Sequence, residues 1–328
     1  MKPRILVIRG GAIGDFILTL PAINLLREAF PHAHLEILGY KHIVALAEGR
    51  FYADATRSIE YGALAGFFIP NSVLAPDLVE YFSSFQQIVS YLYDPDGIFE
   101  TNLRRAGVKN ILRAFQQVDD TEHAARQLAR PLQEMALYLE DHAPKIFPSA
   151  DDHSTAREFF GKSGAVAGNG NGSSDDDETI IAVHPGSGSS KKNWPIERWT
   201  ELGRSLLEKH PSARLVLISG EADQAQLDTL SAAWKGLPVL SARELPLPQL
   251  AAIVARCRLF IGHDSGISHL AAAVGTSCLL MFGPTDPAIW APANPAVAVL
   301  EAPDGDLEAL TLEAVAERAA TLLAANRS

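Results

Sequence analysis

Short, continuously apolar runs alternate along the chain with longer segments whose apolar residues recur every three or four positions. Ile5 to Ile8 is the first apolar run, and apolar residues at helical spacing follow from Phe16 to Leu26. His34 to Leu38 is the next run. A continuous run predicts a buried strand and helical spacing predicts an amphipathic helix, so this order predicts a parallel βαβ unit.

The second half of the chain repeats this alternation. Apolar runs predict strands at residues 180–183, 215–218, 259–261 and 278–282. Helices are predicted from Pro195 onward, at 222–234, 250–254 and 267–274, and near the end of the chain over 312–323. Two successive runs of βα units predict an α/β fold with two Rossmann-like, doubly wound parallel-sheet domains. Ligands are expected at the carboxyl ends of the strands and in the cleft between the domains.

A segment rich in glycine, asparagine, serine and aspartate separates the two halves. It runs from Gly164 to Glu178 and ends in four consecutive acidic residues. Such a composition buries too little apolar surface to offset its ordering entropy, so a flexible linker is predicted at residues 164–178. The predicted N-terminal domain therefore covers residues 1–163, and the predicted C-terminal domain covers residues 179–328.

Composition and charge exclude several classes of protein. The chain has 328 residues, 47% of them apolar, and a formal net charge of -11, which is typical of a soluble globular protein without a broad nucleic-acid-binding surface. Cys257 and Cys278 are isolated, which predicts buried thiols in a reducing compartment rather than disulfides or a zinc site. The first apolar run is too short for a signal peptide, and no stretch approaches the roughly 20 apolar residues of a membrane span. The predicted location is the cytoplasm.

The loop after the first predicted strand carries glycines but not the dinucleotide fingerprint. Gly10 to Gly14 lacks the G-x-G-x-x-G spacing, and the second predicted strand ends in Gly39-Tyr40 without an acidic residue for a ribose. A nicotinamide enzyme is therefore disfavoured. Asp15 follows the loop at the start of a predicted helix, where it is either an N-cap carboxylate or a general base that faces the cleft.

Two further loops have the chemistry of anion sites. The small residues from His184 to Ser190 precede Lys191, Lys192 and a helix start, and together they predict a phosphate cradle that is not a Walker A loop. The second loop, Gly262 to His269, joins a predicted strand to a helix. Its polar residues are either helix caps and an interior histidine or a second anion site. Its Asp264-Ser265-Gly266 triplet matches that of aspartic proteases, but those enzymes need two such triplets and the chain has one. The loop also lacks the two glycines that flank the nucleophile of a serine hydrolase.

Two features of the first half remain open. Asp94-Pro95-Asp96 is either a turn or the D-x-D metal motif of the other large glycosyltransferase fold. A basic stretch from Arg104 to Arg113 is either solvated surface or a contact for an anionic acceptor or a membrane.

Three blocks of sequence resemble one family. They are Gly11 to Ala22, followed by Leu26-Arg27 and residues 30–33; His184-Pro185-Gly186 with residues 192–195; and Asp264 to Ala272 with residues 282–287. Together they resemble the ADP-heptose:lipopolysaccharide heptosyltransferases, glycosyltransferase family 9. Residues 40–160 resemble the family only loosely, and the acceptor is expected to bind there.

The resemblance implies a GT-B fold, with the acceptor bound by the N-terminal domain, the donor by the C-terminal domain, and a last helix that packs back toward the first domain. It implies inverting transfer without a metal or other cofactor. Asp15 occupies the place of the general base, and Gly11, Ala12 and Gly14 form the acceptor-side loop. Lys192 is expected to neutralise the departing diphosphate, although one extra loop residue leaves Lys191 as an alternative.

The resemblance also assigns the donor-binding residues. The diphosphate is expected to bind the Ser265 and Gly266 amides and His269, and Asp264 is expected to contact the donor sugar hydroxyls. The residues that match the phosphate loop are His184, Ser187 and Gly188. The candidate ligand for the ribose is Glu221, which stands at a shifted position.

The predicted function is therefore transfer of a heptose from ADP-heptose to a lipopolysaccharide core or related surface glycan. The expected partners are a nucleotide-sugar donor and a lipid-linked or anionic glycan acceptor, with peripheral contact at the cytoplasmic face of the inner membrane and no nucleic acid. The alternatives are the same mechanism with another nucleotide sugar, a non-catalytic nucleotide-sugar-binding protein, and metal-dependent transfer through Asp94 and Asp96.

Overall fold

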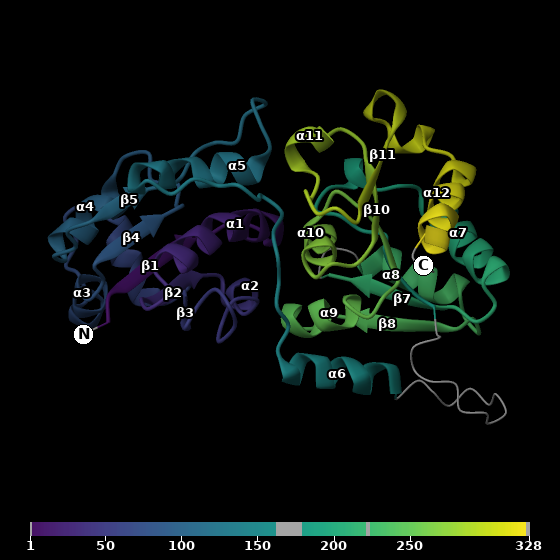
Figure 1. Ribbon diagram of the computed structural model, residues 1–328, viewed down its shortest axis with the longest axis horizontal. Coiled ribbons are helices and arrows are strands. Elements are labelled where there is room, and N and C mark those ends of the chain that lie inside the picture. The colour runs from purple at the N-terminus through teal and green to yellow at the C-terminus, as the bar shows by residue number, and fades with distance from the viewer. Residues whose placement is uncertain (1, 162–178, 221–223, 326–328) are drawn as a thin grey trace. The chain divides into compact units, whose positions relative to one another are not determined.

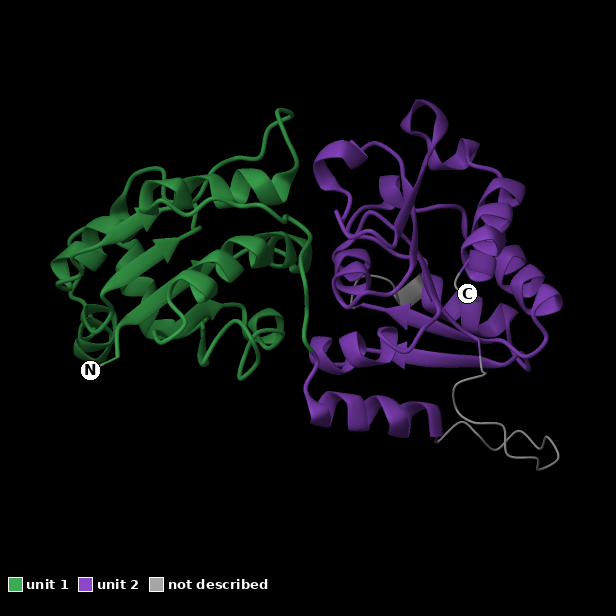
Figure 2. Cartoon of the chain, in the orientation of Figure 1, with its two compact units in different colours: residues 1–147 green, residues 148–328 purple. Residues whose placement is uncertain are grey.

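The chain forms two compact α/β units in a computed structural model that describes residues 2–161, 179–220 and 224–325. The first unit covers Met1–Phe147 and the second covers Pro148–Ser328 (Figure 2). The predicted linker at 164–178 lies outside the described residues. The division between the units falls earlier in the chain than the predicted boundary at residue 163.

The first unit is built on a five-stranded parallel sheet with the strand order β3-β2-β1-β4-β5 (Figure 1). The strands are β1 Arg4–Arg9, β2 His34–Gly39, β3 Ala55–Ser58, β4 Gln87–Ser90 and β5 Ile111–Arg113. The predicted strands at 5–8 and 34–38 are thus confirmed. Since all five strands are parallel, their carboxyl ends lie at one edge of the sheet.

Helices cover this sheet and complete its core. They are α1 Ile13–Ala29, α2 Lys41–Val44, α3 Pro76–Ser83, α4 Ile98–Arg105 and α5 Ala124–Ala129, with 3-10 turns η1 Gly62–Phe68 and η2 Arg130–Met135. Leu6 and Ile8 of β1 pack with Phe67, Phe82 and Phe99, which come from η1, α3 and α4. Helix α1 instead packs against α2 and α5.

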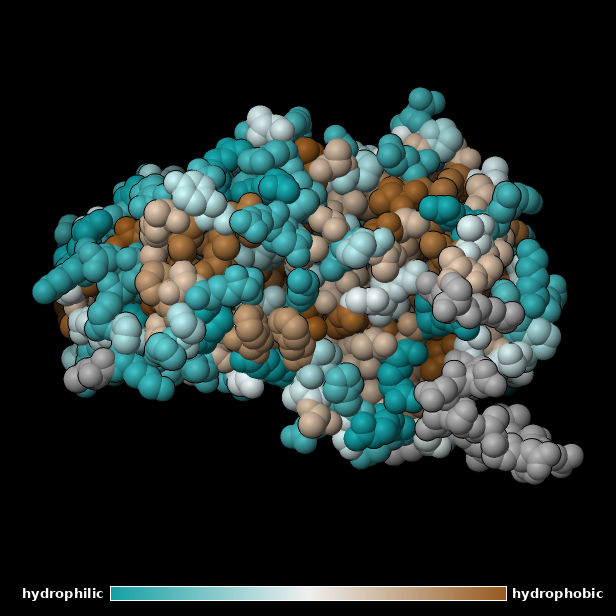
Figure 3. All heavy atoms as spheres, in the orientation of Figure 1, coloured by the Kyte–Doolittle hydropathy of each residue, from teal (hydrophilic) through white to brown (hydrophobic). Residues whose placement is uncertain are grey.

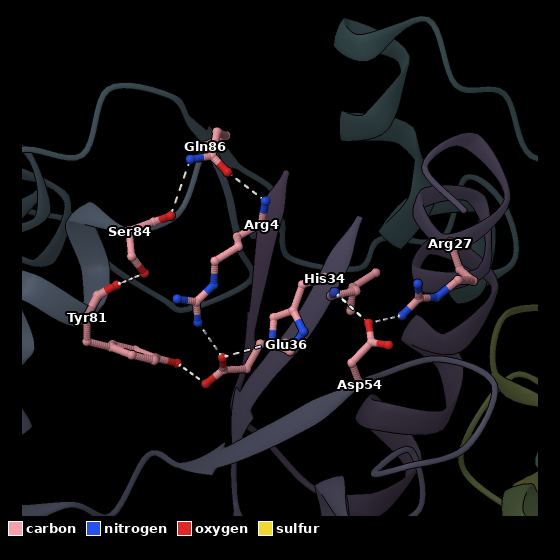
Figure 4. Close-up of polar contacts among 9 residues, drawn as sticks. Arg4, Arg27, His34, Glu36, Asp54, Tyr81, Ser84 and Gln86 are labelled. Carbon is pink, nitrogen blue, oxygen red and sulfur yellow. Dashed lines mark hydrogen bonds and ion pairs between the residues drawn. The ribbon is translucent and has the colours of Figure 1, made fainter. Parts of the chain in front are cut away.

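A buried glutamate in β2 ties α3 to the start of the sheet (Figure 4). The Tyr81 hydroxyl donates to Glu36 Oε1 at 2.6 Å, and Arg4 Nη2 donates to Glu36 Oε2 at 3.2 Å. His34 Nε2 lies 3.7 Å from the same Oε2 atom. Burial is the largest cause that raises the pKa of the Tyr81 phenol, and the hydrogen bond to Glu36 adds to it. The phenol therefore stays protonated and serves as a donor.

Removing this hydroxyl should weaken the first unit. Tyr81→Phe leaves Glu36 Oε1 buried with one donor fewer, and we expect a loss of about 1–3 kcal/mol in the free energy of unfolding. Urea unfolding followed by circular dichroism measures it. All four tryptophans lie in the second unit, so their fluorescence reports that unit separately. Tyr138→Phe is the control, because the Tyr138 side chain is 65% exposed. An unchanged circular-dichroism transition in Tyr81→Phe would contradict the assigned role.

The second unit is built on a six-stranded parallel sheet with the order β11-β10-β9-β6-β7-β8. The strands are β6 Ile180–His184, β7 Arg214–Ser219, β8 Val239–Arg243, β9 Leu259–His263, β10 Cys278–Phe282 and β11 Val297–Glu301. All four strands predicted for this half are confirmed. Both cysteines are free and buried, as expected.

The helices of the second unit explain where the division between the units falls. They are α6 Ala150–Gly161, α7 Ile196–Lys209, α8 Gln224–Ala233, α9 Leu247–Val254, α10 Gly266–Ala273, α11 Pro287–Trp290 and α12 Leu312–Ala325, with 3-10 turns η3 Ser190–Lys192, η5 Pro303–Gly305 and η6 Leu307–Ala309. Helix α6 packs against α9, so it belongs to the second unit although it precedes the glycine-rich segment. Helix α12 packs against α7, β9 and β10 of its own unit, and its predicted packing toward the first domain stays a prediction.

Two features of the molecule relate to membrane contact, the hydropathy of one face and the length of the helices. On the face drawn in Figure 3, hydrophilic residues are interspersed with apolar ones. Among the described residues, no helix combines the length and the apolar character that a membrane crossing requires.

Candidate active site

The loop between β1 and α1 holds the side chain of Asp15 in one orientation. Ala12 N donates to Asp15 Oδ2 at 2.9 Å, which forms half of a capping arrangement at the start of α1. Gly11 has φ +92°, and a Cβ atom there would lie 2.8 Å from Asp15 Oδ2. A side chain at position 11 would therefore be strained and would displace the carboxylate.

Arg9 fixes the other side of this aspartate and is a residue that sequence analysis missed. Its Nη2 atom lies 3.7 Å from Asp15 Oδ1 and donates to the Asp15 carbonyl at 3.1 Å, and its Nε donates to Thr19 Oγ1 at 2.9 Å. Burial lowers the pKa of the Arg9 guanidinium, and the adjacent Asp15 carboxylate opposes that shift. The available signal was the position of Arg9, a charge that closes an apolar strand directly before a glycine-rich loop.

The two interpretations of Asp15 are compatible in this geometry. The cap uses Oδ2, and the Asp15 side chain is still 43% exposed, whereas the Arg9 side chain is only 10% exposed. A carboxylate that is oriented by a cap and a buried cation, yet open to solvent, can accept a proton from a bound hydroxyl group.

In the second unit, three neighbouring strands bring a lysine, an aspartate and a threonine together. Lys192 follows β6, Asp264 follows β9 and Thr285 follows β10, and these strands are adjacent in the sheet. Lys192 Nζ donates to Asp264 Oδ2 at 2.6 Å, and Thr285 Oγ1 donates to the same oxygen at 2.8 Å. Thr285 was not predicted as a site residue, although it lies in the block 282–287.

The structure distinguishes the two lysines by their surroundings. The Lys192 side chain is 29% exposed and that of Asp264 is 11% exposed, so this ion pair is largely shielded from solvent. Lys191 is an exposed residue. The loop is also anchored beyond the lysines, because Trp194 N donates to His263 Nε2 at 2.8 Å and Trp194 Nε1 donates to the Leu310 carbonyl at 2.8 Å.

The small residues before the lysines differ in what they offer a ligand. Ser187 is buried, and its hydroxyl lies 2.7 Å from both the Ser189 carbonyl and Asn193 Oδ1. Its hydroxyl therefore stabilises the loop itself. Gly188 is exposed, and a Cβ atom at this position would meet nothing within 4 Å, so a ligand can approach the backbone there.

The start of helix α10 lies beside the end of β6. Ser265 caps the helix by accepting from Ser268 N at 3.3 Å, and Gly266 is the first helical residue. Ser265 Oγ lies 3.4 Å from Nδ1 of His184, which ends β6. His269 is a buried residue one turn into α10. The sequence-predicted residues His184, Ser265 and Gly266 are thus brought together at the positive end of a helix.

The remaining predicted residues lie elsewhere or outside the described chain. Glu221 falls outside the described residues. Asp94 accepts from Phe99 N at 3.2 Å and from Glu100 N at 3.0 Å, so its carboxylate caps α4. Within the parts of the chain that the structure describes, no group of three or more His, Cys, Asp or Glu side chains is arranged to hold a metal ion.

Much of the basic stretch in the first unit is engaged within that unit. Arg104 and Arg113 both form ion pairs with Glu100. Arg105 donates to Asn102 Oδ1 at 2.6 Å and to the Ser72 carbonyl at 2.9 Å. The expected contact with an acceptor or a membrane stays a prediction.

Two parallel-sheet α/β units with polar residues at the carboxyl ends of their strands have the architecture of GT-B glycosyltransferases. Residues 107–315 match the model of glycosyltransferase family 9 (heptosyltransferase). The chain belongs to this family.

Individual relatives agree with the family assignment. The chain is 23% identical over 300 residues to lipopolysaccharide heptosyltransferase 3 of Escherichia coli, covering 85% of this chain and 83% of that protein. It is 35% identical over 96 residues to lipopolysaccharide heptosyltransferase 1 of Pseudomonas aeruginosa, covering 29% of this chain and 26% of that protein.

Solved structures show the same fold over the full length. An E. coli ADP-heptose lipopolysaccharide heptosyltransferase II has a TM-score of 0.78 at 17% identity, with 100% of both chains covered. A glycosyltransferase of family 9 from Veillonella parvula has a TM-score of 0.77 at 20% identity, covering 98% of this chain and 97% of that one. The predicted two-domain α/β fold is confirmed.

Proposed function

We propose that this chain transfers a heptose from ADP-heptose to the core of a lipopolysaccharide or a related surface glycan, with inversion at the anomeric carbon and without a metal ion. The observation that carries the proposal is the shielded Lys192–Asp264 pair, 2.6 Å between Nζ and Oδ2, in the same unit as the capped start of α10. Family membership supports the transferase chemistry.

The departing nucleotide diphosphate gains negative charge as the glycosidic bond breaks. Lys192 supplies a positive charge for it, and the first amides of α10 supply oriented dipoles. His269 and the exposed backbone at Gly188 complete the proposed phosphate contacts. Preorganised donors of this kind perform the role that a divalent cation has in metal-dependent transferases.

The acceptor hydroxyl needs a base as it attacks. In the proposed reaction its oxygen bonds to the anomeric carbon from the face opposite the diphosphate, while the bond from that carbon to the diphosphate oxygen breaks. The hydroxyl proton passes to the Asp15 carboxylate, whose orientation is set by Ala12 N and Arg9. A carboxylate suffices because the hydroxyl becomes acidic only as the new bond forms.

The remaining roles complete the proposal. Asp264 is proposed to contact hydroxyl groups of the donor sugar, and Glu221 the ribose. The acceptor is proposed to be lipid-linked or anionic, which would bring the protein to the cytoplasmic face of the inner membrane. The basic residues from Arg104 to Arg113 are the proposed contact there.

The described site also fits the same mechanism with another nucleotide sugar. Its charged groups, Lys192 and the start of α10, recognise the diphosphate, which all nucleoside-diphosphate sugars share. An oriented, solvent-open carboxylate at position 15 suits proton uptake in a transferase, and family membership supports a transferase rather than a non-catalytic sugar-binding protein. The transferase is therefore favoured over the binding protein.

A thermal-shift panel tests the donor and the metal. ADP-heptose at about 100 times its dissociation constant should stabilise the second unit by about 2.7 kcal/mol, whereas UDP, GDP and CMP sugars at the same concentration should stabilise it less. Tryptophan fluorescence follows the melting of that unit, and EDTA should leave the shift unchanged. A larger shift with another nucleotide would replace ADP-heptose as the donor. Loss of the shift in EDTA would contradict metal independence.

A further inference from the structure

A pocket lies at the carboxyl ends of β4 and β5 in the first unit. It has a volume of about 210 Å³ and is lined by residues in and after the two strands and by residues of α4. Pockets that hold drug-sized ligands measure roughly 300–1,000 Å³, so this one suits a single small ring. We call it the β4–β5 pocket.

Two exposed aromatic side chains stand at this pocket. Tyr93 follows β4 and is 70% exposed, and Phe115 follows β5 and is 41% exposed. Their ring centroids lie 5.1 Å apart with an angle of 57° between the planes. Paired aromatic surface left in water is costly, which marks a place where a ligand with an apolar face would bind.

The same pocket is also lined by charged side chains that form ion pairs. Glu100 and Arg113 line the pocket and bind each other, and Arg104 binds the same carboxylate. Burial opposes ionisation of Glu100, but the hydrogen bonds from Arg104 and Arg113 outweigh it and lower the pKa of Glu100. The Arg113 side chain is 62% exposed and that of Glu100 is 14% exposed. The pocket therefore offers both donors and acceptors beside an apolar surface.

The pocket adjoins the loop that carries Asp15. Strand β4 pairs directly with β1, and the two strands end at the same edge of the sheet. Leu92 lines the pocket, and its Cδ2 atom lies 3.4 Å from where a Cβ atom at Gly10 would stand. Gly10 begins the loop that continues through Gly11 to Asp15, so the pocket and the loop of the proposed base lie at the same edge of the sheet and share Leu92 as a neighbour.

We propose that the β4–β5 pocket binds one sugar ring of the acceptor glycan and that Tyr93 and Phe115 contact its C–H face. This inference rests on the proposed function, because it takes the acceptor to be a glycan. A sugar ring has an apolar C–H face and a rim of hydroxyl groups, which match the aromatic pair and the Glu100–Arg113 pair. A lipid chain would take water away from the exposed Arg113 guanidinium without replacing its hydrogen bonds, and a free phosphate would leave the aromatic rings uncovered.

The test compares acceptor use by variants of the full chain. The probe is de-O-acylated lipopolysaccharide that lacks heptose, with ADP-heptose at saturation. Tyr93→Ala and Phe115→Ala should each raise the KM for the glycan about tenfold, and the double variant should raise it further. Tyr93→Phe keeps the ring and should stay within about twofold. Tyr138→Ala, which removes a 65%-exposed ring outside the pocket, is the matched control.

Donor binding separates a pocket effect from a general loss of structure. The thermal shift that ADP-heptose produces should be the same in all these variants, because the proposed donor residues lie in the other unit. An unchanged glycan KM in the double variant would overturn the inference. A fall in donor binding that matches the fall in acceptor use would overturn it as well.

A second measurement keeps the two proposals distinguishable. Saturation-transfer NMR with the same glycan needs no turnover, so it tests the pocket even if the protein transfers no heptose. We expect a transfer signal with the unsubstituted protein and its loss in the double variant. Binding without turnover would refute the proposed function and leave the pocket supported. Equal signals with both proteins, or no signal with either, would refute the pocket.

Discussion

The Asp15→Asn variant is expected to bind ADP-heptose as tightly as the unsubstituted protein and to transfer heptose about 10²–10⁴ times more slowly. Asparagine keeps an oxygen for the hydrogen bond from Ala12 N, so the start of α1 stays intact. It removes the ability to take up a proton. Rates measured under saturating donor and acceptor isolate the chemical step.

Asp77→Asn is a matched control for this variant. Asp77 lies in the first turn of α3, as Asp15 lies in the first turn of α1, and it is exposed on the same unit. Its substitution should leave kcat unchanged. If Asp15→Asn kept more than about a tenth of the normal kcat, the proton would have another acceptor and the assignment of the base would be wrong.

The second large effect is expected at Lys192. Lys192→Met removes the charge proposed to stabilise the leaving diphosphate, and we expect kcat to fall about 10²–10³-fold together with a rise in the KM for the donor. Lys191→Met is the control, because Lys191 is exposed and the shielded ion pair with Asp264 belongs to its neighbour. A larger loss in Lys191→Met than in Lys192→Met would move the role to Lys191.

The Lys192 variant needs a check on folding. Without the lysine, the largely buried Asp264 carboxylate loses its ion pair and, among the described residues, keeps the hydrogen bond from Thr285, so some loss of stability is expected. Melting of the second unit without donor measures that loss. Activity compared well below the melting temperature then reports the chemistry. A folded Lys192→Met protein with normal kcat would refute the mechanism.

Sequence patterns identified β1 and β2 in the first sheet and the four middle strands of the second sheet, and they missed β4 and the strands at the edges. All five residues of strand β6 are buried and the first four are apolar, so they form a continuous run. Strands β3, β5, β8 and β11 lie at the sheet edges and mix polar with apolar residues. An edge strand is paired on one side only, so burial imposes a weaker pattern on its sequence.

The domain boundary shows where composition misleads. The glycine-rich segment was the strongest linker signal in the sequence, yet the structure divides the chain between Phe147 and Pro148. The cause is helix α6, whose partner α9 lies about ninety residues further along the chain. Which helix covers which sheet is a long-range contact, and local composition contains no record of it.

The loops of the candidate site could be predicted from the sequence, but the contacts between its side chains could not. The loops before Asp15, Lys192 and Ser265 were evident from small residues at strand ends. The contact that Arg9 makes with Asp15 depends on side-chain direction, and the contact that Thr285 makes with Asp264 depends on strand order as well. A sequence motif does not specify which strands are neighbours in the sheet, so contacts across neighbouring strands could not be predicted from the motifs.

The Lys192–Asp264 contact has a consequence for competition by cellular phosphates. Lys192 Nζ has the Asp264 carboxylate at 2.6 Å, so an anion that binds this lysine must compete with a partner of similar strength. Inorganic phosphate, which offers one such group, gains little from the exchange. A diphosphate whose second group reaches the amides of α10 gains an additional set of hydrogen bonds. If the donor binds as proposed, this ion pair therefore acts as an internal competitor for Lys192, and it favours ligands with two linked phosphates over ligands with one.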